Sequence, residues 1–67
     1  LGGDAMTEDE AIAKAAEVFP GDYDAAYGSY DLQTGVWTVR FFAGEQETGR
    51  VTVDPEGNAV VGNGENG

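Results

Sequence analysis

Few side chains in this sequence are suited to catalysis. The 67 residues include no histidine and no cysteine, which removes the commonest general base, the commonest zinc ligand and any thiolate nucleophile. Carboxylates remain, for example Glu45 and Glu47. Acid–base work by two carboxylates needs a pocket that separates their pKa values, and the sequence indicates no such pocket. We therefore expect a protein that is not an enzyme.

Two segments are similar to ligand-binding loops. Residues 22–24 (Asp-Tyr-Asp) resemble the start of a calcium loop, which needs an oxygen ligand at its fifth position and glycine at its sixth. Ala26 and Tyr27 occupy those positions. Gly44 and Gly49 lie in an acidic region and lack the Gly-Lys-Ser/Thr context of a phosphate loop. We expect the aspartates to cap a turn, and we expect no metal and no cofactor.

The charge of the chain is strongly unbalanced. Thirteen acidic residues outnumber three basic ones, for a net charge of −10. Such a surface repels nucleic-acid backbones and anionic membranes, and no apolar run approaches the roughly 20 residues of a membrane helix. We expect no nucleic-acid partner and no membrane insertion. Solubility is the simplest role of the charge, and attraction of a basic partner is the alternative.

A helix is predicted before Pro20. Thr7 and Glu10 have the spacing of a capping box, and the acidic residues of the first turn suit the positive end of the helix dipole. Pro20 disfavours helical geometry at Phe19 and so ends the helix. One apolar stripe at helical spacing should face a sheet, and its members are Ile12, Ala15, Ala16 and Phe19.

Residues 36–42 form the most strand-prone run, with three β-branched and three aromatic residues. Alternation places Trp37, Val39 and Phe41 on one face, which we assign to the core together with Tyr30. Thr38, Arg40 and Phe42 occupy the opposite face. Phe42 is either covered by the neighbouring loop or part of a partner surface.

Residues 25–31 are expected to pair with this strand through a four-residue loop, residues 32–35. A loop one residue shorter would turn polar side chains into the core, because a one-residue slip reverses every side chain. Gly35 should close the loop with positive φ, and Gly28 should leave room for Phe19. The expected pairs are Tyr30 with Trp37, Gly28 with Val39 and Ala26 with Phe41.

A third strand is predicted over residues 48–53, with Arg50 and Thr52 facing outward. Residues 43–47 should form a loop whose pairing register stays open. The segment 54–58 (Asp-Pro-Glu-Gly-Asn) is a turn that requires positive φ at Gly57. It should pair Val53 with Ala59 and Val51 with Val61, while Val60 points outward.

These elements predict an α+β fold, in which one N-terminal helix packs on an antiparallel sheet of three or four strands, as a helix followed by a β-meander. The expected divisions are a disordered N-terminal end over residues 1–6, a single domain over residues 7–61 and a disordered tail over residues 62–67. We expect a monomer.

The helix, the aromatic strand 37–41 (Trp-Thr-Val-Arg-Phe) and the segment 51–60 (Val-Thr-Val-Asp-Pro-Glu-Gly-Asn-Ala-Val) resemble the PepSY domain family. The resemblance covers roughly Met6 to Val61. It implies a non-catalytic module outside the cytoplasm, as in the propeptides of thermolysin-type metallopeptidases and in small bacterial proteins that are secreted or lipid-anchored. It also implies binding or inhibition of a peptidase.

The expected function is therefore an extracytoplasmic binding module with a protein or peptide partner. Two alternatives are an acidic decoy that binds a basic protein and a purely structural domain of a larger secreted protein. The predicted partner surface is the sheet face away from the helix, where paired arginines could bind a carboxylate or a peptide backbone. Its residues are Thr38, Arg40, Phe42, Arg50 and Thr52. The arginines could instead merely offset Glu45 and Glu47.

Overall fold

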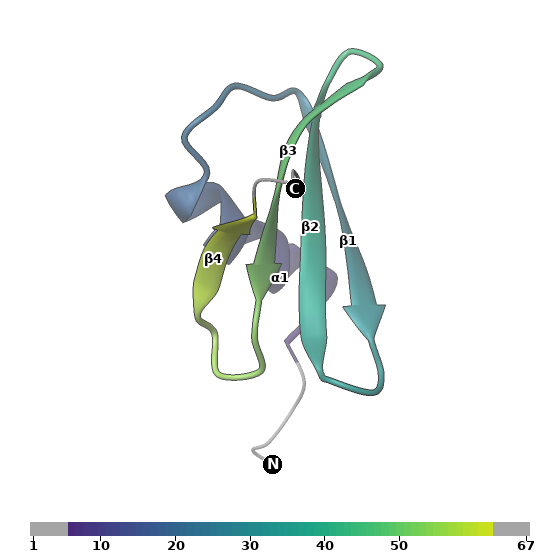
Figure 1. Cartoon of the computed structure of the whole chain (residues 1–67), viewed down its shortest axis with the longest axis vertical. Coiled ribbons are helices and arrows are strands. Elements are labelled where there is room, and N and C mark those ends of the chain that lie inside the picture. The colour runs from purple at the N-terminus through teal and green to yellow at the C-terminus, as the bar shows by residue number, and fades with distance from the viewer. Residues whose placement is uncertain (1–5, 63–67) are drawn as a thin grey trace.

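The structure is a computed structural model that describes residues 6–62. One helix, α1 (Glu8–Val18), precedes four strands: β1 (Ala25–Asp31), β2 (Val36–Ala43), β3 (Gln46–Val53) and β4 (Ala59–Gly62). The strands form one antiparallel sheet in the order β1-β2-β3-β4. Helix α1 lies across one face of this sheet, behind the strands in Figure 1. The predicted α+β fold, a helix followed by a β-meander, is confirmed.

The ends of α1 follow from local sequence signals. Thr7 N donates to Glu10 Oε1 at 3.0 Å, and Glu10 N donates to Thr7 Oγ1 at 3.2 Å, which completes the capping box. Phe19, before Pro20, leaves the helical conformation with φ −76° and ψ 121°. The innermost helix residues are Ala11, which the predicted stripe omitted, and Ala15, and both are fully buried. Their small side chains let the helix lie close to the sheet.

The centre of the core is aromatic. Phe41 is fully buried, and its ring stacks on that of Phe19 with centroids 4.2 Å apart and planes 4° apart. Tyr23 meets Phe41 edge-on at 4.7 Å. Trp37 is only partly buried, and Tyr30, which the sequence assigns to the core, is 40% exposed. The two rings contact each other at the rim of the sheet.

The β1–β2 register is as predicted, with Tyr30 opposite Trp37 and Gly28 opposite Val39, and Gly35 closes the loop at φ 76°. The expected neighbour of Gly28 was wrong. A Cβ at Gly28 would meet Glu8 Cγ and Trp37 Cε3, each at 3.1 Å. The Gly28 amide instead donates to Glu8 Oε2 at 2.9 Å.

The ring of Phe19 lies over Gly49 of β3 rather than over Gly28. A Cβ on Gly49 would lie 3.0 Å from Phe19 Cζ and would collide with Phe19 Cε1. The absence of a side chain at Gly49 therefore leaves room for the Phe19 ring to stack on Phe41. In the sequence, Gly49 was considered only as part of a phosphate loop, which its context excludes.

The β2–β3 hairpin is tighter than predicted. Gly44 and Glu45 form its turn, Gly44 has φ 64°, and β3 begins at Gln46 rather than at residue 48. The register shifts between Phe41 and Phe42, which pair with Gly49 and Glu47, so Thr48 is the extra residue of a β-bulge. Its hydroxyl lies 3.2 Å from the carbonyl oxygen of Asp22.

The β3–β4 turn is as predicted. Asp54 N donates to Asn58 O at 2.9 Å, and Gly57 has φ 92°. Val53 pairs with Ala59 and Val51 with Val61.

Two residues that the sequence assigned to disordered ends belong to the ordered fold. Met6 packs against the core, and its carbonyl oxygen accepts a hydrogen bond from Trp37 Nε1 at 3.2 Å. Gly62 pairs with Arg50 as the last residue of β4. The remaining residues of the two ends, 1–5 and 63–67, lie outside the described part of the chain.

Replacing Gly57 with alanine should destabilise the protein by about 1 kcal/mol or more, because a Cβ disfavours positive φ. The nearest atom to that Cβ would be Lys14 Cε at 3.4 Å, an ordinary contact, so backbone strain is the expected cause. Urea unfolding measures the effect. Gly57→Asn is the matched variant and should cost less, since asparagine tolerates this conformation better. Equal losses for both variants would contradict the assigned cause.

Hydrogen bonds to Asp54 should make the turn sensitive to acid. The backbone amide of Asn58, followed by its side chain and the amides of Glu56 and Gly57, lowers the pKa of Asp54 below its usual 3.8. A lowered folded-state pKa contributes stability above the unfolded value, and that stability is lost as the pH falls through the folded value. Between about pH 5 and pH 2, wild type should therefore lose more stability than Asp54→Asn. Parallel losses in the two proteins would contradict this assignment.

Candidate functional site

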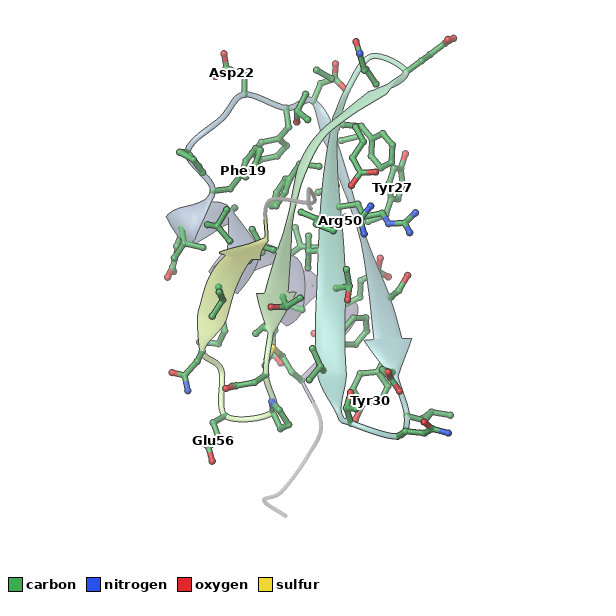
Figure 2. All side chains as sticks on the ribbon, viewed as in Figure 1. Phe19, Asp22, Tyr27, Tyr30, Arg50 and Glu56 are labelled. Carbon is green, nitrogen blue, oxygen red and sulfur yellow. The ribbon has the colours of Figure 1, made fainter. Side chains whose placement is uncertain are left out.

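The sheet has one face that no helix covers. Val39, Val51 and Val53 point toward α1 and are fully buried, so the residues that alternate with them in β2 and β3 point away from it. Figure 2 is viewed onto this open face, with Tyr27 and Arg50 labelled on it. All five predicted site residues lie there, and we call this surface the open face: Thr38, Arg40, Phe42, Arg50 and Thr52.

Strand register brings the two arginines directly opposite each other. Arg40 of β2 is the Cα partner of Arg50 in β3, and Tyr27 of β1 is the Cα partner of Arg40 on the other side. The result is a Tyr27–Arg40–Arg50 row across three strands. Like charges directly opposite each other in a sheet are unfavourable. An anionic group bound beside these two arginines would offset part of this repulsion.

The two arginines differ in what neutralises them. Arg50 Nε donates to Glu47 Oε2 at 3.0 Å, and Arg50 Nη2 donates to Glu47 Oε1 at 3.4 Å. Both side chains are partly exposed, so this pair contributes under about 1 kcal/mol to stability. Within residues 6–62, no carboxylate lies within 4.0 Å of the Arg40 guanidinium. The alternative that acidic neighbours offset both arginines thus holds for Arg50 and fails for Arg40.

Phe42 gives the open face an apolar margin. It is partly buried, and its ring meets that of Tyr27 at 5.7 Å in an edge-to-face arrangement. Tyr27 of β1 thus covers part of the Phe42 ring, and cover by the neighbouring loop stays a prediction. Tyr27 itself is 60% exposed and belongs to the surface. The predicted register already placed Tyr27 opposite Arg40, so the sequence carried the signal that would have included it.

Hydroxyl groups form a second row beside the arginines. Ser29, Thr38 and Thr52 are aligned across β1, β2 and β3. A shallow hollow of about 620 Å³ adjoins Ser29 and Thr38. It extends from the arginines to the β1–β2 loop, where Leu32 is 88% exposed. The open face thus combines guanidinium donors, hydroxyl groups and exposed apolar area, which are groups that recognise a protein or peptide.

Two of the other acidic candidates, Asp24 and Glu47, have structural contacts. Asp24 Oδ2 accepts a hydrogen bond from Gly44 N at 3.0 Å, so Asp24 caps the β2–β3 turn as predicted. Glu47 binds Arg50. Among the described residues, no group of three or more acidic side chains is placed to hold a metal ion.

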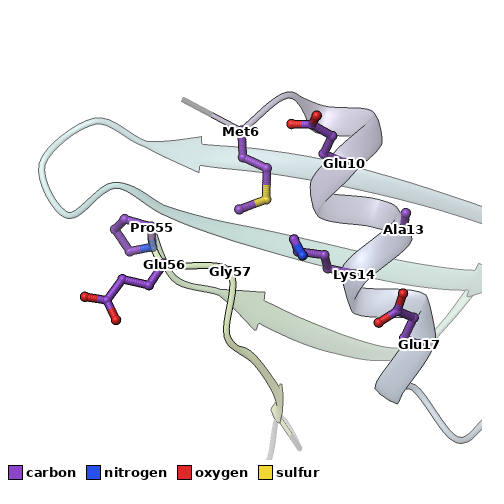
Figure 3. A pocket seen from close by; sticks show the side chains of 8 residues that line it. All are labelled: Met6, Glu10, Ala13, Lys14, Glu17, Pro55, Glu56 and Gly57. Atoms are coloured by element: carbon purple, nitrogen blue, oxygen red, sulfur yellow. The ribbon is translucent and has the colours of Figure 1, made fainter. Parts of the chain in front are cut away.

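A second hollow, of about 480 Å³, lies between α1 and the β3–β4 turn. Figure 3 shows Lys14 reaching from α1 toward Gly57 across it. Lys14 Cε lies 3.4 Å from the position of a Cβ at Gly57, so the aliphatic part of Lys14 covers the turn. Glu10, Glu17 and Glu56 also border this hollow.

Comparisons with known proteins give no further identification. No protein-family model, no curated protein and no solved structure matches the chain. Across residues 6–62, no helix is long and apolar enough to cross a membrane.

Proposed function

We propose that this protein is a non-catalytic binding module whose partner contacts the open face. The observation that carries the proposal is the exposed Arg40, which has no carboxylate partner within residues 6–62 and stands directly opposite Arg50. Paired guanidinium groups on neighbouring strands suit a carboxylate or the carbonyl oxygens of a peptide. The aromatic rings of Tyr27 and Phe42 supply apolar contact area beside them.

A peptidase is the proposed partner, and the cell envelope or the extracellular space is the proposed location. Both come from the resemblance of the sequence to the PepSY domain family. The order of elements, with an alanine-lined helix before a meander whose second strand is aromatic, supports this assignment. Binding of the module would restrain the peptidase without any chemistry on the module itself.

The acidic-decoy alternative requires carboxylates in a regular array on one face, as in a nucleic-acid backbone. In the described residues, acidic side chains are instead spread over both ends of α1, the segment between α1 and β1, the ends of the first two hairpins and the β3–β4 turn. Several have local partners, such as Glu8 with Gly28 and Glu47 with Arg50. This distribution favours the binding module.

The test is inhibition of a thermolysin-type metallopeptidase by the isolated protein and two double variants. Arg40→Ser with Phe42→Ser removes one cation and one apolar ring from the open face. Lys14→Ser with Val18→Ser removes one cation and one apolar side chain from exposed positions of α1. Wild type and the helix variant should inhibit similarly, and the open-face variant should be weaker by about tenfold or more.

Circular dichroism must show that both variants keep the fold at the assay temperature. Equal inhibition by wild type and the open-face variant would move the partner surface elsewhere, most directly to the acidic start of α1. Failure of wild type to bind or inhibit such peptidases would overturn the choice of a peptidase as partner.

A further inference from the structure

The two edges of the sheet differ in whether a charged side chain blocks their backbone groups. At the β1 edge, the Glu8 carboxylate reaches from the helix and accepts the hydrogen bond of the Gly28 amide at 2.9 Å. A charged side chain that occupies an edge amide is a known way to prevent pairing with another strand. At the β4 edge, no side chain of residues 6–62 occupies a backbone amide in this way, and the strand residues Ala59, Val60, Val61 and Gly62 are all uncharged.

The backbone groups of Ala59 and Val61 in β4 are directed away from the sheet. Asp54 N donates to Asn58 O, so alternation along an antiparallel ladder makes Ala59 and Val61 non-hydrogen-bonded positions with respect to β3. Their N–H and C=O groups therefore face the outer edge. Within residues 6–62, no loop or side-chain group bonds to them. Val60 is 61% exposed and Val61 39% exposed, so the edge also offers apolar contact.

A notch lies at the end of this edge. It has a volume of about 210 Å³ and is bordered by Phe19, Pro20, Gly49 and Val61. The notch is on the helix side of the sheet, because Val61 alternates with the outward-facing Val60. In a strand added outside β4, the residue opposite Val61 would point to this same side. An aromatic or branched side chain at that position would fit the notch.

We propose that the outer edge of β4 binds an extended peptide segment of another protein as a fifth strand, and that this segment carries basic residues beside alternating apolar ones. The outward N–H and C=O groups of Ala59 and Val61 can form main-chain hydrogen bonds with an added strand, so the expected occupant is an extended peptide. Net charge selects its chemistry: the chain carries −10, so basic residues are attracted, whereas a second copy of the chain is repelled. The proposal does not depend on the open face.

The probe is a seven-residue peptide of alternating threonine and apolar residues, with a central phenylalanine and lysine at both ends. It is titrated into the ¹⁵N-labelled protein, and amide NMR signals are followed. We expect saturable shifts centred on Ala59 and Val61, together with slower exchange of these two amides with solvent. Replacing the lysines of the peptide with glutamate should weaken binding by about tenfold at low ionic strength.

Two matched comparisons separate backbone pairing from side-chain contact. A peptide N-methylated at alternate residues on its pairing edge cannot form the ladder and should bind at least about tenfold more weakly. Val61→Pro removes the outward amide and should have a similar effect, because proline is tolerated on an edge strand. Val61→Thr keeps the amide and a β-branched side chain and should bind within a few-fold of wild type.

The N-methylated peptide needs no change in the protein, so the test holds even if Val61→Pro does not fold. Equal binding of the methylated and unmethylated peptides would overturn the proposal. So would shifts confined to the open face, no saturable binding at millimolar peptide, or concentration-dependent dimerisation through β4 in the absence of peptide.

Discussion

Replacing Phe41 with alanine is expected to lower the free energy of unfolding by about 3–5 kcal/mol. This is most of the stability available to a domain of 67 residues. Phe41 is fully buried, and its ring contacts those of Phe19 and Tyr23 with centroids 4.2 Å and 4.7 Å away. Alanine leaves a cavity between the helix end and the sheet, which the surrounding backbone can fill only in part.

Urea unfolding followed by circular dichroism measures this loss, and Trp37→Ala is the comparison. Trp37 is the larger side chain, but it is only partly buried and contacts Tyr30 at the rim. The structure therefore predicts that Phe41→Ala is the more destabilising change. The reverse order would show that the centre of the core lies at Trp37.

Gly49→Ala is expected to destabilise the protein by about 1–3 kcal/mol, although it adds a single methyl group. That methyl would collide with Phe19 Cε1 and lie 3.0 Å from Cζ. The Phe19 ring cannot retreat easily, since it is also stacked on Phe41. Gly62→Ala is the matched control, because a Cβ there meets only ordinary contacts at 3.6 Å and beyond.

A double-mutant cycle with Phe19→Leu tests the cause of the Gly49 effect. The smaller leucine should relieve the collision, so Gly49→Ala should cost less in the Phe19→Leu background, with a coupling of at least about 0.5 kcal/mol. Additive effects would mean that the added methyl group acts through the strand backbone and not through the ring.

The fold was predictable because turn chemistry and alternation agreed in two of the three hairpins. A four-residue loop ending in Gly35 was the choice that kept Trp37, Val39 and Phe41 on one apolar face, and burial requires that face. The Asp-Pro-Glu-Gly-Asn turn likewise permitted one register for β4. In both cases one local signal and one long-range requirement pointed to the same pairing.

Features that depend on three-dimensional packing were not predictable. The β2–β3 register needed a bulge at Thr48, whose hydroxyl lies 3.2 Å from the carbonyl oxygen of Asp22 in a distant loop. Two glycines, Gly28 and Gly49, were available to receive Phe19. Which of the two glycines lies under Phe19 depends on where α1 crosses the sheet, and the spacing of residues in the sequence does not predict that position.

The position of the candidate site followed from alternation alone, because Arg40 and Arg50 had to face away from Val39 and Val51. The difference between the environments of the two arginines did not follow from alternation. The ion pair of Arg50 with Glu47 arises at the bulged end of β3, and the sequence left that register open. That Arg40 is exposed and has no carboxylate partner among residues 6–62 is therefore a finding of the structure.

The most direct test of the open face as the partner surface is a ¹⁵N NMR titration of the protein with a thermolysin-type metallopeptidase. Arg40 and Arg50 are the only arginines in the sequence, so their two side-chain Nε signals report on this surface alone. We expect both signals to shift and saturate with the peptidase, with the larger change at Arg40. Unchanged arginine signals, together with shifts in the amides of Glu8, Asp9 and Glu10, would contradict the account.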